Sequence, residues 1–169
     1  YIPYGANLFT NNDENILQKF DLQPHRYYLI ISRLQSDNNI ETIIHGHLNS
    51  EIRHPLLIIG NINNGFAQKL KKNYSSSLVR FAGGIYDQNI LNNLRFYSAA
   101  YFHGHSAGGT NPSLLEAMAA GAFICAHENR FNREVLDNEA YYFKNANDVT
   151  EFIYSVKDKT HRKDQLNKN

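Results

Sequence analysis

Residues 103–121, HGHSAGGTNPSLLEAMAAG, combine a loop of small residues with the start of a short helix. Asn111 is a good N-cap, and Pro112 suits the first helical position, where its missing N–H costs nothing. Gly121 can end the helix as the residue just past its C-terminus. The pattern therefore predicts a short helix whose first turn begins near residue 112.

The residue types around the start of this helix predict a site for a phosphorylated ligand. Unsatisfied N–H groups at a helix N-terminus attract anions, and Gly108 and Gly109 let a diphosphate approach without meeting a Cβ atom. Glu116 lies about one turn into the helix, and helical side chains lean toward the N-terminus. Its carboxylate could accept two hydroxyl hydrogens from the diol of a ribose. The alternative is a solvent-facing glutamate on a well-capped structural helix.

Two further loops could complete such a site. The loop SRLQSDNN, residues 32–39, contains Arg33, whose guanidinium could hold a diphosphate through paired charge-assisted hydrogen bonds, or form a surface salt bridge instead. In GGIYDQN, residues 83–89, Ile85 and Tyr86 could meet a base, although turn chemistry and core packing explain them almost as well. No GxGxxG motif follows the first apolar run, which weighs against an NAD-dependent dehydrogenase.

The histidines and the single cysteine offer weaker chemistry. His45 and His47 are two apart on an expected helix, so they cannot form an i, i+4 metal pair, and we expect both on the surface. His103 and His105 could chelate a metal from an extended backbone, but no third ligand lies close in sequence, and we expect no metal site. Cys125 lies in the apolar run AFICA and is expected to be a small core residue.

Composition limits the classes of function. A chain of 169 residues with 42% hydrophobic content can close one core, and we expect one domain. Its 17 basic and 16 acidic residues give a net charge of +1, which favours neither nucleic acid nor anionic lipid. One cysteine and no apolar run near the roughly 20 residues of a membrane span predict a soluble, cytoplasmic protein. The opening YIPYGA is typical of a hinge, so the chain is expected to be a fragment of something longer.

Apolar runs alternate with helical patterns, which predicts an α/β fold with a parallel six-stranded sheet and helices on both faces. One helix is expected from residue 40 with Asn38 as its cap, a second from Asp87, and a third after Asn147. Weaker helical patterns cover 63–73 and 130–136. The expected strands are 27–32, 55–60, 78–83, 99–104, 122–126 and 140–143.

The sequence resembles the retaining GT-B glycosyltransferases of family 4, specifically their carboxy-terminal, nucleotide-sugar-binding half. The resemblance rests on YIPYGA, SRLQSDNNIETII, VRFAGGIYD, HGHSAGGTNPSLLEAMAAG and FNREVLDNEAYYF. The run HGH…GGTNPSLLEAM is most similar to a bacterial rhamnosyltransferase-like branch. The resemblance covers residues 1–156 and implies a hinge segment at 1–10 and a Rossmann-like nucleotide-sugar-binding domain at 11–156. From Lys157 the chain turns polar and basic, which predicts a polar tail at 157–169.

Residue by residue, the resemblance implies that Glu116 binds the nucleotide ribose and that Arg33 grips the diphosphate. Two positions depart from the family: Gly108 stands where the first glutamate of the E-x7-E motif is expected, and Asn38 where a phosphate-binding lysine is expected. His105 or Ser106 could supply a substitute contact, and we assign catalytic roles to His105 and Glu116. The other expected donor-binding residues are Gly109, Thr110 and Asn111, whose backbone cradles phosphate and sugar, and Ile85, which packs on the base.

The resemblance implies transfer of a hexose from a nucleoside-diphosphate sugar, such as dTDP-rhamnose, with retention and without metal or cofactor. The acceptor, a growing cell-surface polysaccharide or lipid-linked glycan, would be bound through an amino-terminal domain absent from this chain, at the inner face of the cytoplasmic membrane. This chain alone would then bind donor and transfer nothing. The alternatives are a non-catalytic nucleotide-sugar-binding or regulatory module, and a sugar-nucleotide epimerase, for which a credible Tyr-x3-Lys pair is missing.

Overall fold

The computed structural model describes residues 5–107, 109 and 111–156. Across these residues the chain forms one six-stranded sheet with the order β3-β2-β1-β4-β5-β6. Every neighbouring pair of strands is parallel. The predicted Rossmann-like sheet is confirmed. The strands are β1 (Tyr28–Ile31), β2 (Leu56–Ile59), β3 (Val79–Gly83), β4 (Ala100–His103), β5 (Ile124–His127) and β6 (Tyr141–Phe143).

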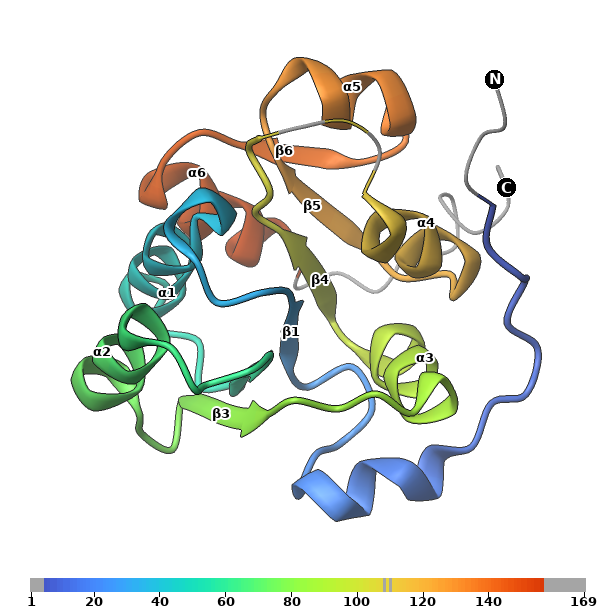
Figure 1. The fold of residues 1–169 in the computed structure, drawn as a ribbon, viewed down its shortest axis with the longest axis horizontal. Coiled ribbons are helices and arrows are strands. Elements are labelled where there is room, and N and C mark those ends of the chain that lie inside the picture. The colour runs from blue at the N-terminus through green and yellow to red at the C-terminus, as the bar shows by residue number, and fades with distance from the viewer. Residues whose placement is uncertain (1–4, 108, 110, 157–169) are drawn as a thin grey trace.

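Helices cover both faces of this sheet (Figure 1). The α-helices α1, α2 and α6 pack on one face, while the 3-10 helix η1 packs with α3, α4 and α5 on the other. A second 3-10 helix, η2, lies in the loop before α1. The bounds are η1 (Glu14–Phe20), η2 (Ser36–Asn38), α1 (Ile40–Asn49), α2 (Gly65–Tyr74), α3 (Gln88–Tyr97), α4 (Pro112–Ala119), α5 (Arg130–Leu136) and α6 (Ala146–Ser155).

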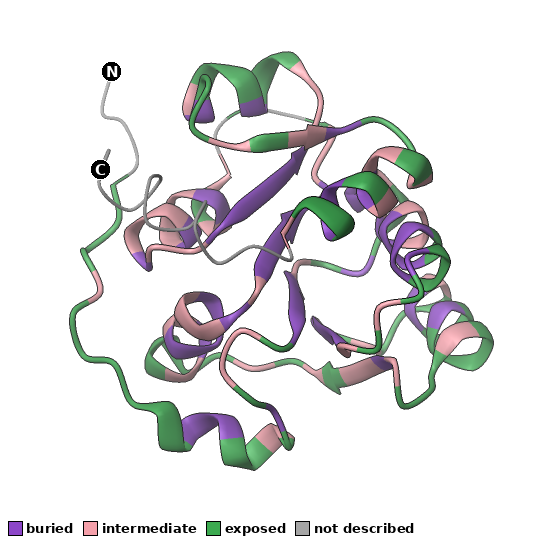
Figure 2. Cartoon of the chain, turned by 180° about the vertical axis from the view of Figure 1, so that it is seen from behind, coloured by how far each residue is buried: buried purple, intermediate pink, exposed green. Residues whose placement is uncertain are grey.

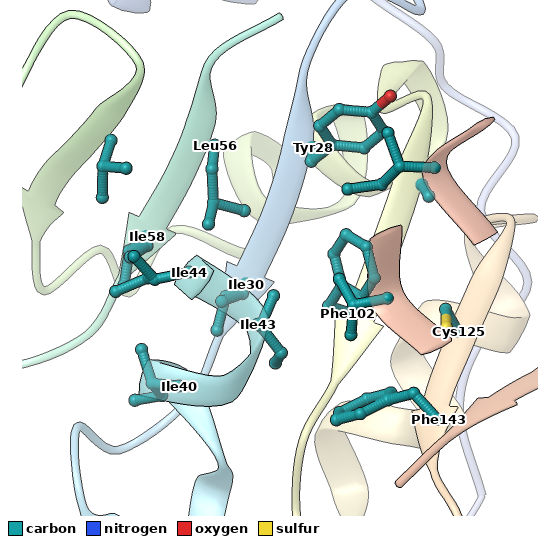
Figure 3. Packing of buried hydrophobic residues seen from close by; sticks show 14 of the residues in the cluster. Tyr28, Ile30, Ile40, Ile43, Ile44, Leu56, Ile58, Phe102, Cys125 and Phe143 are labelled. Atoms are coloured by element: carbon teal, nitrogen blue, oxygen red, sulfur yellow. The ribbon is translucent and has the colours of Figure 1, made fainter. Parts of the chain in front are cut away.

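The four central strands, β2, β1, β4 and β5, are buried because helices cover both faces of the sheet, whereas the edge strands β3 and β6 are partly exposed (Figure 2). Successive side chains of a strand point to opposite faces. On β1, Tyr28 and Ile30 join the cluster under α1, α2 and α6, whereas Leu29 joins the opposite cluster. Figure 3 shows the first cluster, in which Cys125 lies beside strand and helix residues. Burial raises the pKa of the Cys125 thiol well above its usual value, so its predicted role as a core residue is confirmed.

Several local predictions were wrong. Asn38 does not cap α1, because Asn39 occupies the N-cap position, and α6 begins after Asn145, whose side chain forms a capping box, rather than after Asn147. His47, expected on the surface, is buried, and its Nε2 lies 3.2 Å from the carbonyl oxygen of Leu78. The segment that forms η1 was not predicted as helical.

Other helix ends agree with the sequence. Asp87 caps α3 by accepting hydrogen bonds from two backbone N–H groups, and Gly121 follows α4 with a positive φ of 63°. The two weaker helical patterns correspond to α2 and α5. Within the described part of the chain, no helix has both the length and the apolar character needed to span a bilayer.

Candidate functional site

The strand order reverses between β1 and β4, which pair with each other in the middle of the sheet. The chain leaves β1 toward α1 on one face and leaves β4 toward α4 on the other face. The two loops, residues 32–39 and 104–111, therefore diverge at the carboxyl ends of the strands. In open α/β sheets this switch point is where ligands bind.

Short polar contacts hold these two loops against each other. Asn39 donates its side-chain amide to the carbonyl of Gly104 at 2.8 Å. The backbone N–H and the hydroxyl of Ser106 both donate to the carbonyl of Asp37, at 3.0 and 2.8 Å. A Cβ atom at Gly104 would collide with the backbone carbonyl of Asn38, so glycine is required for this approach. The loops are thus fixed relative to each other.

Asn38 and His105, both predicted as donor-site residues, form part of this contact. Asn38 is 4% exposed, and its side-chain N–H donates to the carbonyl of Arg33 at 2.8 Å. Its Oδ1 is therefore the side-chain atom that can accept a hydrogen bond from another residue. His105 Nδ1 lies 3.1 Å from that Oδ1. Because an amide oxygen only accepts, Nδ1 of His105 carries the proton in this contact. Asn38 therefore joins the two loops, whereas the lysine expected there would have offered a charge.

The start of α4 confirms the predicted cap but not the predicted free N–H groups. Asn111 Oδ1 accepts from the N–H of Ser113 at 2.9 Å, and the carbonyl of Asn111 accepts from Leu114 at 3.0 Å. Pro112 has no N–H to offer. An anion at this turn must therefore replace the Asn111 side chain or bind the preceding backbone. Of that backbone, Gly109 is exposed with no atom within 4 Å of a Cβ placed on it, while Gly108 and Thr110 lie outside the described residues.

Glu116 lies on α4 with both carboxylate oxygens engaged. Its Oε2 accepts from Nη2 of Arg95 at 2.6 Å, and its Oε1 accepts from Nε2 of Gln88 at 2.8 Å. The Glu116 side chain is 30% exposed, whereas that of Arg95 is 1% exposed. The carboxylate therefore does not point into bulk solvent, and it keeps lone pairs that a ligand could reach from the exposed side.

Arg95, which was not among the predicted site residues, also contacts the start of α4. Its Nη2 also donates to the hydroxyl of Ser113 at 3.2 Å. Tyr101 OH lies 3.0 Å from that hydroxyl and 3.3 Å from the carbonyl oxygen of Ile31, the last residue of β1. Burial raises the pKa of Tyr101, which stays neutral. A signal was present, since Arg95 follows Leu91 by four residues and so falls on the buried face of α3.

Two predicted contact residues lie at neighbouring loops. Arg33 is exposed at the end of β1, and its guanidinium has no hydrogen-bond or ion-pair partner within residues 5–107, 109 and 111–156. Ile85 is partly buried and packs against the core under α3 and α4, and Tyr86 beside it is 83% exposed. Arg33 is therefore free to bind an anion, while Ile85 also serves the core.

His103 ends β4 as a neutral, buried imidazole. It is 4% exposed, and its Nε2 has no hydrogen-bond partner in the described part of the chain. Burial, with a smaller effect from His105, lowers the pKa of His103 to about 3. The rings of His103 and His105 lie 6.1 Å apart. Over the same described ranges, no group of three or more His, Cys, Asp or Glu side chains could hold a metal ion.

The fold is shared with solved glycosyltransferase structures. The carboxy-terminal domain of a group 1 glycosyl transferase, LpcC, from Francisella tularensis matches with a TM-score of 0.73 and 16% identity over 96% of this chain and 93% of that one. A glycosyltransferase from Rickettsia africae matches at 0.68 and 15% identity, covering 92% and 46%. A trehalose-phosphate synthase from Burkholderia xenovorans, solved with glucose-6-phosphate, matches at 0.70 and 11%, covering 91% and 40%.

The chain thus spans less than half the length of the latter two proteins. Its fold corresponds to one half of a GT-B glycosyltransferase. No protein-family model matches the sequence, and no curated protein matches it at a significant level.

Replacing Glu116 by alanine is expected to destabilise the fold by about 3 kcal/mol, because Arg95 would remain as a buried, unpaired charge. Combining Glu116→Ala with Arg95→Met should recover most of this loss. Urea denaturation followed by circular dichroism measures both effects. The matched control is Glu134→Ala, which removes the exposed partner of Arg130 and should change stability little. A Glu116→Ala variant as stable as this control would contradict the buried pairing.

The low pKa of His103 predicts a loss of stability in acid. Between pH 6.5 and 3 the unfolded chain binds a proton at this position and the folded chain does not, so stability falls as pH falls. From pH 7 to pH 5, His103 alone should cost about 2 kcal/mol. Urea titrations at both pH values should show a smaller loss for His103→Gln than for the unmodified chain. Equal losses in the two proteins would contradict this account.

Proposed function

We propose that this chain is the donor-binding half of a retaining glycosyltransferase that uses a nucleoside-diphosphate sugar. The observation that carries the proposal is the carboxylate of Glu116, held one turn inside a helix that starts at the switch point of the sheet. A partly exposed carboxylate accepts hydroxyl hydrogens but repels phosphate, so it suits the neutral sugar of a nucleotide. The GT-B fold of the structural neighbours supports this choice of ligand.

The remaining roles follow from charge and position. Arg33, with its exposed guanidinium at the end of β1, would neutralise the diphosphate. The backbone of residues 109–111 would contact phosphate and sugar, and Ile85 would pack against the base. We assign His105 a contact to the donor sugar near the reacting carbon, since its protonated Nδ1 is already used by Asn38 and its Nε2 is available as an acceptor in the neutral ring.

In transfer of a glycosyl group, negative charge grows on the β-phosphate while the sugar becomes cationic. On this proposal Arg33 and the backbone N–H groups ahead of α4 stabilise the leaving diphosphate without a metal or cofactor. The donor is dTDP-rhamnose or another nucleoside-diphosphate hexose. The acceptor is a growing cell-surface polysaccharide or lipid-linked glycan, bound through a further domain at the cytoplasmic face of the membrane. This chain alone would bind donor without transferring it.

A non-catalytic nucleotide-sugar-binding module is the second candidate. Gly108 favours it, because a glycine cannot supply the donor contact expected from a glutamate at that position. Measurement of sugar transfer by the full-length protein separates the two, since only the enzyme would consume donor in the presence of acceptor.

Thermal denaturation of the 169-residue chain with UDP, GDP and dTDP tests the proposal. A nucleotide that binds should stabilise the folded chain by about 2.7 kcal/mol at 100 times its Kd. Arg33→Ala should weaken binding by about tenfold or more, because it removes a charge-assisted contact to the diphosphate. The matched control is Arg53→Ala. Arg53 is exposed and precedes the amino end of β2, so it lies away from the carboxyl ends of the strands. Absence of stabilisation by all three nucleotides would refute the proposal.

A further inference from the structure

His103 is the last residue of β4, and its side chain lies on the same face of the sheet as that of Tyr101, two residues earlier. The two rings are 6.3 Å apart and inclined by 29°. Tyr101 OH lies 3.0 Å from the hydroxyl of Ser113 in the first turn of α4, and 3.3 Å from the carbonyl oxygen of Ile31 at the end of β1. His103 lies about 7 Å further along the strand. It is therefore at the edge of the sheet where the chain leaves β1 and enters α4.

The imidazole of His103 is buried at this edge with one nitrogen unpaired. His103 is 4% exposed, and its Nε2 has no hydrogen-bond partner among the residues that the structure describes. The segment that follows is held in place, because the carbonyl of His105 accepts from the side-chain amides of Asn129 and Asn132 at 3.0 and 3.1 Å. A buried nitrogen without a partner costs free energy that an apolar side chain would not. Such an atom indicates a partner that these residues do not provide.

An anion at the start of α4 needs hydrogen-bond donors besides the first N–H groups of the helix. The N–H groups of Ser113 and Leu114 both donate to Asn111. Pro112 has no N–H. The unpaired nitrogen of His103 is at the same end of the sheet and can supply a donor that the helix lacks.

The ring of His103 is neutral. Burial, with a smaller effect from His105, lowers the pKa of His103 to about 3. A neutral imidazole carries one N–H, on whichever ring nitrogen faces an acceptor. Because the oxygens of an ionised phosphate only accept, Nε2 carries the hydrogen when it faces a phosphate. The ring then offers one directed hydrogen bond without a positive charge.

On the basis of the proposed function, we propose that Nε2 of His103 donates a hydrogen bond to the diphosphate of the bound nucleoside-diphosphate sugar. His103 reaches the diphosphate from the buried side, whereas Arg33 reaches it from the exposed side. The nitrogen gains its partner only when the ligand binds, so its cost to the unliganded fold is recovered in the complex.

Isothermal titration calorimetry with UDP, GDP and dTDP tests this proposal on variants of His103. His103→Phe keeps an aromatic ring and removes the N–H, so the nucleotide that binds should bind about tenfold or more weakly, the loss of a hydrogen bond to a charged group. His103→Gln keeps an N–H at the end of the side chain and should restore most of the affinity.

The matched control is His54→Phe. Nδ1 of His54 is also buried without a hydrogen-bond partner in the described part of the chain, but His54 precedes the amino end of β2, away from the proposed site. His54→Phe should leave nucleotide affinity unchanged. At pH 7 and without ligand, His103→Phe should be at least as stable to heat as the unmodified chain, because it removes an unpaired buried nitrogen.

Nuclear magnetic resonance follows the same nitrogen without any substitution. In ¹H–¹⁵N correlation spectra of the imidazole rings, the nucleotide that binds should shift the Nε2 signal of His103 and leave the signals of His54 in place. This measurement also decides the question if His103→Phe fails to fold.

The outcomes separate this inference from the function on which it rests. A nucleotide that binds without shifting the His103 signal, or that binds His103→Phe as tightly as the unmodified chain, would overturn the role of His103 while nucleotide binding stands. Failure of all three nucleotides to bind would overturn the proposed function together with the inference.

Discussion

The site depends on a full positive charge buried between two helices. The side chain of Arg95 on α3 is 1% exposed, and such a charge is tolerated only when a partner of opposite sign meets it with good geometry. Glu116 on α4 is that partner, at 2.6 Å. The pairing fixes α4 against α3 and also fixes the carboxylate in one position. A residue that could bind a ligand is thus held in place by an interaction that the fold itself requires.

The switch point of the sheet gives this pair its location. The hydroxyls of Ser113 and Tyr101 connect Arg95 to the last carbonyl of β1, so α4 is tied to the strand beside which the order reverses. On the other side, Asn38 and His105 join the loops that follow β1 and β4. Polar contacts therefore fix the positions of α4 and of both loops around the place where a ligand would bind.

The sequence predicted the sheet and most helices because these follow from local patterns. Apolar runs such as 55–60 became strands within two residues of the expected ends, and Asp87 capped the helix that its position indicated. Asn38 and His47 were misjudged because their partners, His105 and Leu78, lie far away in the sequence. The pattern of apolar and polar residues along the sequence carries no information about contacts between distant residues, so only the tertiary structure reveals them.

For the candidate site too, the sequence predicted the residues with local roles and missed those defined by distant contacts. Asn111, Pro112 and Gly121 were assigned their places on α4 from residue type alone, since capping is a local property. Arg95 and Gln88 were missed, because what matters about them is their contact with Glu116 from another helix. The roles of Arg33, Asn38, Ile85, Gly109, Asn111 and Glu116 toward a ligand stay predictions, as do those of Gly108 and Thr110 outside the described residues.

The most direct measurement is a crystal structure of this chain with a bound nucleoside diphosphate. We expect the diphosphate beside Arg33 and the backbone of residues 109–111, with a hydroxyl of the nucleotide sugar within hydrogen-bonding distance of Glu116. A nucleotide bound elsewhere, or a Glu116 carboxylate that still contacts only Arg95 and Gln88 while the ligand is present, would contradict it.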